Sequence, residues 1–298
     1  MDASANTNST AASTNGIAAA RSRPVIQQSD HRQPERRPQA GTLTQQMKIS
    51  VVTVCFNSEP HIADALRSVD AQTWHDIEHI VVDGVSRDKT LQVVASFPQP
   101  WRHVVSEGDA GIYDAMNKGI RLATGDVVAF INSDDFYASP LVLALVASVF
   151  QDPSVDGCYG DLCYVRQDDV TTTVRYWRSS PHKCGEFAKG WVPPHPTLFL
   201  RRTVFERFGM FDLQYRIAAD FELMARLLEV KRIKTVYLPE VLVKMRLGGT
   251  TNKSLSNIVK QNREIWRALV AHGLRPALPA FMLNKLGLRL RQFFSRPA

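Results

Sequence analysis

The sequence predicts an α/β fold in which a mostly parallel central sheet carries helices on both faces. From residue 48 onward, short segments rich in β-branched residues alternate with amphipathic helical segments, as is typical of βαβ units. The 298 residues are 44% hydrophobic, enough for a sizeable core in one large domain or two small ones. The longest mostly apolar run, Leu141 to Phe150, has ten residues including one serine, whereas about 20 are needed to cross a bilayer. A transmembrane helix is therefore not expected.

The elements of the first half can be assigned in chain order. The expected strands are 48–54, 77–83, 102–106 and 126–131, and the helices between them are 59–72, 87–96 and 111–122. In an open parallel sheet, ligands bind outside the carboxyl ends of the strands. The functional site is thus predicted to follow residues 54, 83, 106 and 131.

Polar side chains follow all four of these strands. The segments are Cys55-Phe56-Asn57-Ser58-Glu59, Asp83-Gly84-Val85-Ser86-Arg87-Asp88-Lys89-Thr90, Glu107-Gly108-Asp109-Ala110-Gly111-Ile112-Tyr113-Asp114 and Asn132-Ser133-Asp134-Asp135. Carboxylates that converge repel one another, so a cation is their natural companion. Adjacent acids such as Asp134 and Asp135 favour a hard divalent ion with oxygen ligands. Each segment taken alone could also be a turn or a helix cap, and their joint placement is what favours binding.

The two ends of the chain differ from its body. Residues 1–46 contain almost no large apolar side chains, which predicts a disordered tail. Met47 opens directly into the first strand, and one hypothesis is that Met47, not Met1, is the natural start. We expect the folded domain to span residues 47–252 and C-terminal helices with a basic amphipathic tail to span residues 253–298.

Residues 278–296 have the pattern of a basic amphipathic helix. Its polar side consists of Lys285, Arg289, Gln292 and Arg296, and its apolar side of Met282, Leu283, Leu286, Leu290, Phe293 and Phe294. One interpretation is an anchor that lies on an anionic membrane surface. The other is a helix packed on the body with its basic face in water. A nucleic-acid partner is not expected, because no nucleic-acid-binding motif accompanies the basic residues.

The cysteines and the N-terminus indicate in which cellular compartment the protein is expected. Cys55, Cys158, Cys163 and Cys184 lack zinc-site spacing, and no secretory signal is visible. Reduced thiols are therefore expected, which fits a cytoplasmic protein. Peripheral contact with the inner face of the cytoplasmic membrane is a hypothesis that depends on the C-terminal helix.

Several motifs occur in a consistent order between about Lys48 and about Asn252. They are the opening strand Ile49-Ser50-Val51-Val52-Thr53-Val54 with Asn57, then Asp83-Gly84-x-Ser86-x-Asp88-x-Thr90, the segment Ser106 to Gly119, Asn132-Ser133-Asp134-Asp135, Gly209-x-Phe211-Asp212 and Ala219-Asp220-Phe221-Glu222-Leu223. Together they resemble family 2 glycosyltransferases with a GT-A fold, whose central sheet is Rossmann-like. The resemblance is strongest to members of colanic-acid and exopolysaccharide biosynthesis.

The resemblance implies transfer of a sugar from a nucleoside diphosphate donor to an acceptor hydroxyl, with inversion. Asp83 resembles the carboxylate that holds the nucleobase, and Asp134 the one near the ribose. Asp135, with Asp134, resembles the site of Mn²⁺ or Mg²⁺, an ion that neutralises charge on the leaving diphosphate. Asp220 resembles the catalytic base that deprotonates the acceptor hydroxyl. From its position alone, Asp220 would be taken for a helix N-cap.

Four more residues of these motifs are candidates for nucleotide-sugar binding: Asn57, Glu59, Asn117 and Lys118. The sequence also departs from the family pattern at three positions. Asn132 replaces the first acid of the usual Asp-x-Asp, Met116 stands where many relatives have Arg, and Val85 stands where many have Gly.

The second half of the sequence suggests an acceptor side. Residues 157–200 are strand-like and aromatic, and three prolines stiffen the stretch from Trp191 to Pro196. Trp191 and His195 are acceptor candidates, with ordinary core packing as the alternative. Arg246 precedes a glycine-rich turn and is expected to bind the diphosphate from a flexible loop, with a plain surface arginine as the alternative.

We therefore expect a metal-dependent, inverting glycosyltransferase of cell-surface polysaccharide biosynthesis. Its acceptor would be a saccharide, expected to be lipid-linked. The alternative from another class is a non-catalytic nucleotide-sugar-binding or scaffold protein with a decayed site. A dehydrogenase is excluded, because the segment after the first strand lacks GxGxxG.

Overall fold

The computed structural model describes residues 47–248, 255–274 and 277–294. The expected tail at residues 1–46, the turn residues 249–251 and Arg296 lie outside the described residues.

The strands and helices of the first half agree with the sequence prediction to within a few residues. The strands are β1 (Ile49–Cys55), β2 (Ile77–Asp83), β3 (Arg102–Ser106), β4 (Val127–Phe130), β5 (Asp135–Tyr137), β6 (Gly157–Val165), β7 (Thr173–Trp177), β8 (Phe199–Arg201) and β9 (Thr235–Arg246). The α-helices are α1 (Ile62–Asp70), α2 (Thr90–Ala95), α3 (Ile112–Leu122), α4 (Val142–Val149), α5 (Arg202–Phe208), α6 (Ala219–Met224), α7 (Leu255–Ala271) and α8 (Leu278–Phe294). Short 3₁₀ turns are η1 (Phe187–Lys189) and η2 (His195–Thr197), and a π-helical turn, η3 (Ala225–Val230), continues α6.

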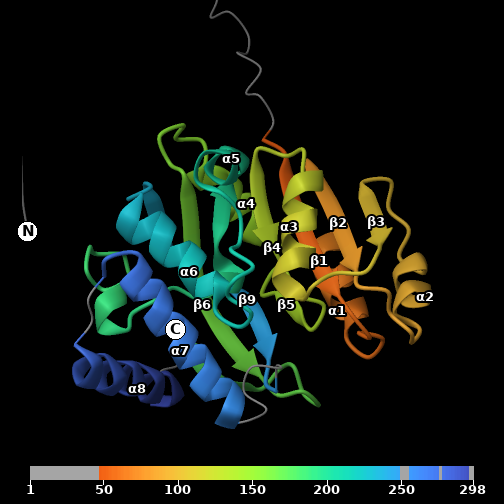
Figure 1. The fold of residues 1–298 in the computed structure, drawn as a ribbon. Helices are drawn as coiled ribbons and strands as arrows, with labels where there is room; N and C mark the ends of the chain where they lie inside the picture. Colours follow the sequence, from red (N-terminus) through yellow and green to blue (C-terminus); the bar gives the residue numbers. More distant parts are fainter. Residues whose placement is uncertain (1–46, 249–254, 275–276, 295–298) are drawn as a thin grey trace, which may run out of the picture. The chain divides into compact units, whose positions relative to one another are not determined.

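These strands form one sheet in the order β3-β2-β1-β4-β8-β6-β9-β5, with β7 beside β6 (Figure 1). β1 pairs in parallel with β2 and β4, and β2 pairs in parallel with β3. β6 and β9 are also parallel, and their carboxyl ends pair Val165 with Arg246. The antiparallel strands are β5, β7 and β8. The mostly parallel sheet confirms the predicted α/β class and brings the carboxyl ends of β1 to β4 to one edge.

Helices cover both faces of the sheet because apolar side chains point alternately to either side of each strand. Val52 and Val54 of β1 face a core shared with α3, α5, α6 and α7. Ile49 and Val51 face the opposite core, which contains α4. α1 and α2 pack together with Val81 of β2 in a third, smaller cluster.

The C-terminal helices pack against this body. Ile265, Ala268 and Leu269 of α7 are buried in the same core as α6. Phe281 of α8 joins that core, and Figure 1 shows α6, α7 and α8 on the side of the sheet away from β3. In the part of the chain that the structure covers, no helix is both long enough and apolar enough to span a bilayer.

The polar side of α8 contacts the body. Lys285 Nζ donates to Asn262 Oδ1 of α7 over 2.7 Å. Gln292 Oε1 accepts from Arg175 Nε of β7, also over 2.7 Å. The apolar side is exposed, and its exposed members are Met282, Leu283, Leu286, Leu290 and Phe293. Helix α8 is therefore packed on the body, as one interpretation expected, but the side that meets the body includes Lys285 and Gln292. Arg289 and Arg291 are exposed, and the membrane interpretation stays a prediction.

Candidate functional site

The loops after β1, β2 and β4 are joined by hydrogen bonds at the predicted edge. Asn57 Oδ1 accepts the N–H of Arg87 over 2.8 Å, and the Ser58 N–H donates to Thr90 Oγ1 over 2.7 Å. The hydroxyls of Ser58 and Ser133 lie 2.8 Å apart. The loops after β1, β2 and β4, which are distant in sequence, are thus connected to one another at this edge of the sheet.

Asp83 lies at the end of β2, fully buried. Its carboxylate accepts hydrogen bonds from the N–H and hydroxyl of Ser86 and from the Ser106 hydroxyl. Burial alone would raise the pKa of Asp83, but these hydrogen bonds lower it below its ordinary value. Asp83 therefore carries a negative charge at neutral pH. Its hydrogen bond from Ser106 joins the end of β2 to the end of β3. Its contact with a nucleobase stays a prediction.

The backbone beside Asp83 is unusual. Asn57 has φ 50° and Val85 has φ 63°, a region that asparagine tolerates but a β-branched residue rarely adopts. Strain of this kind gathers at functional sites. At Gly84, an added Cβ would lie 2.6 Å from Asp109 Oδ2. The Asp109 side chain of the loop after β3 thus lies close to the turn after β2, and a larger residue at position 84 would displace it.

Asn117 joins α3 to the loop after α5. It is buried in α3, where its amide donates to Phe211 O over 2.9 Å and its Oδ1 accepts the Phe211 N–H over 3.0 Å. Both ends of the carboxamide are occupied by this backbone pair. Asn117 thus fixes the loop after α5, and its contact with a nucleotide stays a prediction.

Glu59 and Lys118 lie at the same edge and bind within the protein. Glu59 Oε2 accepts the N–H of Lys89 over 3.2 Å. Lys118 Nζ donates to Gly108 O over 2.6 Å and pairs with Glu107 over 3.0 Å. Both residues stabilise loops at this edge of the sheet, and their contacts with a nucleotide sugar stay predictions.

The two adjacent acids lie where the sequence predicted a cation. Asp135 opens β5, is fully buried, and receives the Asn132 amide on Oδ2 over 3.1 Å. Its Oδ1 is buried and has no hydrogen-bond partner among the described residues. Burial and the neighbouring Asp134 raise the pKa of Asp135 well above its ordinary value. A buried carboxylate oxygen without a partner, next to a second carboxylate, fits a divalent cation.

The described residues contain no group of three or more His, Cys, Asp or Glu that could hold a metal. Two carboxylates suffice where phosphates and water complete the coordination, as is common for Mg²⁺. Asn132, which replaces the first acid of the family motif, orients Asp135 through its amide.

Arg246 ends β9 beside these acids. Its Nη1 donates to Asp134 O over 2.8 Å, and its Nη2 pairs with Asp64 of α1. The guanidinium lies 5.2 Å from the Phe136 ring, and the residue is only 5% exposed. The alternative of a surface arginine is therefore wrong. Arg246 holds the backbone at Asp134, and its contact with a diphosphate stays a prediction.

Asp220 lies in the first turn of α6. The N-cap of this helix is Ala218, so the interpretation of Asp220 as a cap is wrong. The Tyr113 hydroxyl lies 3.0 Å from Asp220 Oδ1 and 3.0 Å from Ile217 O. Burial and the charge of Asp220 raise the pKa of Tyr113 well above its ordinary value, so its hydroxyl keeps its proton.

Tyr113 received no role from the sequence. The available signal was its position, one residue into the helix that follows β3, within a segment that carries the family resemblance.

The two acceptor candidates are packed among aromatic rings. Trp191 is half-buried, and its indole N–H donates to Ser180 Oγ over 3.0 Å. His195 is buried with its ring 5.7 Å from Phe130 and 5.5 Å from Phe211, and its Nε2 has no partner among the residues described. Burial lowers the pKa of His195, and the charge of Asp220 opposes this decrease. Their contact with an acceptor stays a prediction.

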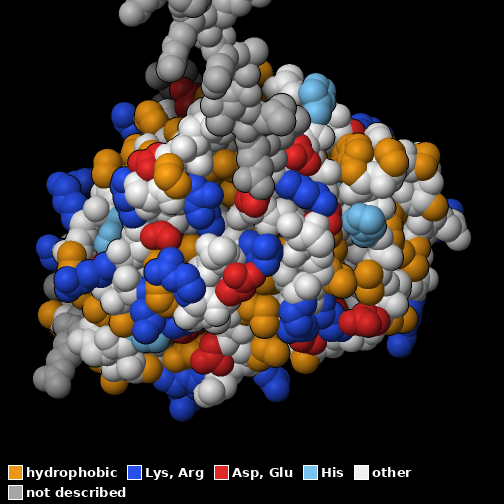
Figure 2. All heavy atoms as spheres, turned by 90° about the horizontal axis from the view of Figure 1, so that it is seen from above, with side chains coloured by type: hydrophobic (Ala, Val, Ile, Leu, Met, Phe, Trp, Pro, Cys, Tyr) orange, Lys and Arg blue, Asp and Glu red, His pale blue; other side chains and the backbone are white. Residues whose placement is uncertain are grey.

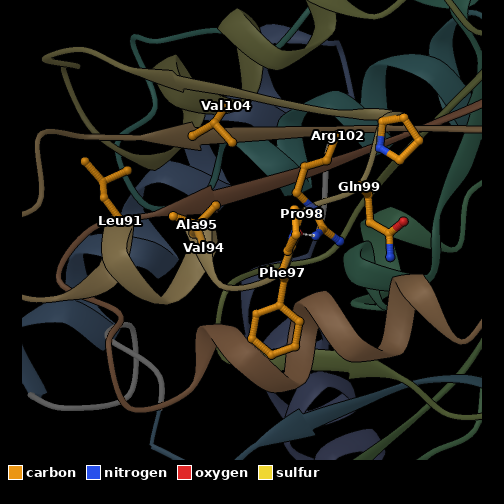
Figure 3. Close-up of a pocket in the computed structure, with 9 residues that line it drawn as sticks. Leu91, Val94, Ala95, Phe97, Pro98, Gln99, Arg102 and Val104 are labelled. Atoms are coloured by element: carbon orange, nitrogen blue, oxygen red, sulfur yellow. Dashed lines mark hydrogen bonds between the residues drawn. The ribbon is translucent and has the colours of Figure 1, made fainter.

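A cavity of about 550 Å³ lies away from this site, between α2 and β3 (Figure 3). Its only charged lining residue, Arg102, donates to Phe97 O and pairs with Asp70. Figure 2 shows hydrophobic side chains gathered toward the end of the molecule where Figure 1 places α2 and β3. This cavity has no carboxylate that could act on a substrate.

Comparison with known proteins shows which protein family the chain matches. The family model described as Glycosyl transferase family 2 matches residues 50–209, more than half of the chain. An uncharacterized glycosyltransferase of Mycobacterium tuberculosis is 33% identical over 186 residues, which are 62% of this chain and 70% of that protein. A PGL/p-HBAD biosynthesis glycosyltransferase of Mycobacterium bovis is 30% identical over 209 residues, covering 68% of this chain and 78% of that protein.

Two solved structures share the fold. Residues 1–349 of S. aureus TarS match with a TM-score of 0.59 at 18% identity, covering 82% of this chain and 72% of that chain. The mannosyltransferase PcManGT from Pyrobaculum calidifontis, in complex with GDP-Man and Mn²⁺, matches with a TM-score of 0.53 at 20% identity, covering 85% and 82%. These likenesses confirm the GT-A architecture that the motifs implied.

Proposed function

The chain belongs to glycosyl transferase family 2, and on that premise we propose that it moves a sugar from a nucleoside diphosphate to a saccharide hydroxyl, with inversion. The single observation that carries the proposal is the buried Asp135 Oδ1, which has no hydrogen-bond partner in the described part of the chain and lies at the sheet edge where the motifs converge. Structural relatives support a nucleotide-sugar donor, since TarS was solved with UDP-GlcNAc and PcManGT with GDP-Man and Mn²⁺.

The donor half of the site is formed around the two acids. Asp135 and Asp134 would hold Mn²⁺ or Mg²⁺, and Asn132 and Arg246 keep the two acids in place. The ion, when bound, neutralises the charge that develops on the leaving diphosphate. Asp83 would bind the base from the end of β2.

The acceptor half is formed around Asp220. Its carboxylate removes the proton of the acceptor hydroxyl as that oxygen attacks the anomeric carbon and the bond to the diphosphate breaks. A single displacement of this kind inverts the anomeric configuration. The Tyr113 hydroxyl and the Phe221 N–H lie 3.0 and 2.8 Å from Asp220 Oδ1, and the other oxygen, Oδ2, would take the proton of the acceptor hydroxyl.

The test is turnover of a panel of UDP, GDP and dTDP sugars, with Mn²⁺ or with EDTA and with a membrane lipid extract as acceptor source. We expect metal-dependent release of one nucleoside diphosphate, and NMR of the product should show an inverted anomeric centre. Nucleotide binding without any turnover would favour the alternative, a non-catalytic nucleotide-sugar-binding protein.

We further propose that the acceptor is lipid-linked, in the biosynthesis of a cell-surface polysaccharide, and that α8 rests on the membrane. The exposed apolar side of α8, which we call the α8 stripe, consists of Met282, Leu283, Leu286, Leu290 and Phe293. Residues 265–298 contain six Lys or Arg and no acid. Arg289 and Arg291 of α8 are exposed, and an anionic lipid surface attracts such positive charges.

Flotation with vesicles of phosphatidylglycerol and phosphatidylcholine tests the membrane contact. Replacing Leu286 and Leu290 by serine should weaken vesicle binding about tenfold or more, because each leucine loses apolar burial in the lipid. The matched control replaces Leu141 and Leu145, which are exposed at α4, by serine and should bind like wild type. Equal binding of all three proteins, or no binding of wild type, would refute the contact.

A further inference from the structure

A carboxylate of α7 holds the loop that leads into α6. Glu264 Oε2 accepts the N–H groups of Ile217 and Ala218 over 2.8 and 3.0 Å. Its Oε1 accepts the N–H of Arg216 over 3.2 Å. Hydrogen bonds to an ionised acceptor are stronger than those between neutral groups. Three consecutive backbone groups are thus fixed directly before the helical turn that carries Asp220.

The same loop is held from the opposite side by α3. Ile217 O lies 3.0 Å from the Tyr113 hydroxyl, which also lies 3.0 Å from Asp220 Oδ1. The N–H of Ile217 is bound by Glu264 and its carbonyl group lies within reach of Tyr113. Movement of this loop would therefore break contacts on both sides at once.

A second contact ties α7 to α6 itself. His272 Nε2 lies 2.7 Å from Glu222 Oε1, and Arg226 Nε donates to the same carboxylate over 2.8 Å. Burial alone would raise the pKa of Glu222, but the hydrogen bonds from His272 and Arg226 lower it below its ordinary value. Glu222 is therefore charged at neutral pH. Contacts thus lie on both sides of Asp220 in the chain: Glu264 of α7 binds residues 216–218, and His272, directly after α7, contacts Glu222.

We propose that Glu264 is a positioning residue for Asp220. It fixes the backbone of the loop at residues 216–218, and through it the place of the Asp220 carboxylate relative to the acceptor hydroxyl. This inference rests on the proposed role of Asp220 as the base. A misplacement of about 1 Å can cost on the order of 10²-fold in rate. Glu264 belongs to α7, which begins at Leu255, so it lies outside residues 50–209, the segment that the family model matches.

The test compares Glu264→Gln with Asp156→Asn. Asp156 likewise accepts a backbone N–H, from Lys234 over 2.9 Å, but it lies at the opposite end of the sheet, before β6. Steady-state turnover should show kcat reduced about tenfold or more in Glu264→Gln, because a neutral amide cannot accept all three N–H groups. KM for the donor and Kd for the nucleoside diphosphate should stay at wild-type values. Asp156→Asn should keep the wild-type kcat.

Hydrogen–deuterium exchange gives a second readout of the same variants. Amides of residues 216–218 should exchange faster in Glu264→Gln and at the wild-type rate in Asp156→Asn. Glu264→Asp, which keeps the charge but is one methylene shorter, should be intermediate in kcat and serves if the glutamine variant does not fold.

The outcomes separate the two proposals. Unchanged kcat in Glu264→Gln beside an active wild type would overturn the positioning role alone. A parallel loss of kcat and nucleotide affinity in Glu264→Gln would do the same, since it would indicate general destabilisation. A wild type without turnover would refute the proposed function, and the positioning role with it.

Discussion

The Tyr113 hydroxyl and Asp220 Oδ1 lie 3.0 Å apart, although the two residues are separated by 107 positions in the chain. Tyr113 belongs to α3, which follows β3, and Asp220 belongs to the first turn of α6. The hydrogen bond joins the motif at the third strand to the motif that carries the candidate base. It also limits how the Asp220 carboxylate can turn.

We expect Tyr113→Phe to reduce kcat by roughly 10- to 100-fold. A hydrogen bond to a charged group contributes about 1.5–3 kcal/mol, and about 1.4 kcal/mol corresponds to tenfold in rate. The Kd for the nucleoside diphosphate should not change, because Asp134 and Asp135 are untouched. Wild-type kcat in Tyr113→Phe would show that this hydrogen bond has no part in the reaction.

Asp220→Asn separates the roles of base and structural group. Loss of a general base should lower kcat by about 10²–10⁴-fold, while the melting temperature should barely change, since Ala218 and not Asp220 is the N-cap of α6. Measurements of kcat and of the melting temperature on the same preparation check both expectations. A large fall in melting temperature with modest loss of kcat would instead assign Asp220 to stability.

Asp135→Asn should stabilise the metal-free protein and abolish metal-dependent nucleotide binding. The buried Oδ1 has no partner within residues 47–248, 255–274 and 277–294. Such a group costs free energy on the order of 1–3 kcal/mol, and a neutral amide reduces that cost. The matched control is Asp161→Asn, because Asp161 is also buried but accepts hydrogen bonds from Tyr176, Ser179 and Tyr237.

Urea unfolding in EDTA should show Asp135→Asn at least as stable as wild type and Asp161→Asn less stable. If both variants lose stability equally, Asp135 is an ordinary structural carboxylate and not a ligand of a cation.

Lys285 should give α8 a stability that depends on pH. Burial and the positive charge of Arg289 lower the pKa of Lys285 to about 8, and Asp220 opposes this change. The unfolded value is about 10.4, so between these two pH values the unfolded chain binds more protons than the folded chain. The contribution of Lys285 to stability therefore rises with pH in this window.

Lys285→Met removes this titration. The free energy of unfolding of wild type minus that of Lys285→Met should accordingly increase between about pH 7 and about pH 10, as measured by urea unfolding. A difference that stays constant over that range would contradict the burial of Lys285 against α7.

Much of the first half of the fold could be predicted because its strands are short segments rich in β-branched residues and its helices are amphipathic. β5 and β8 could not, since each has three residues and depends on antiparallel partners far away in the chain. The edge of the sheet that carries the candidate site could be predicted, because ligands bind outside the carboxyl ends of parallel strands.

The contacts within the site were less predictable. Asn117 binds Phe211 across 94 positions and Arg246 binds Asp64 across 182, and the spacing of residues along the chain carries no signal for either pair. The amphipathic pattern of α8 was clear, but a pattern does not tell which side meets the body. That choice follows from contacts such as Lys285 with Asn262.

The central claim is that the edge around Asp135 binds a nucleoside diphosphate through a divalent cation. Calorimetric titration of UDP and of GDP, first with Mn²⁺ and then with EDTA, tests it most directly. We expect one of the two nucleotides to bind in the presence of Mn²⁺ and its binding to disappear with EDTA. Binding that persists in EDTA would contradict the role of the cation, and no binding of either nucleotide would contradict the donor site itself.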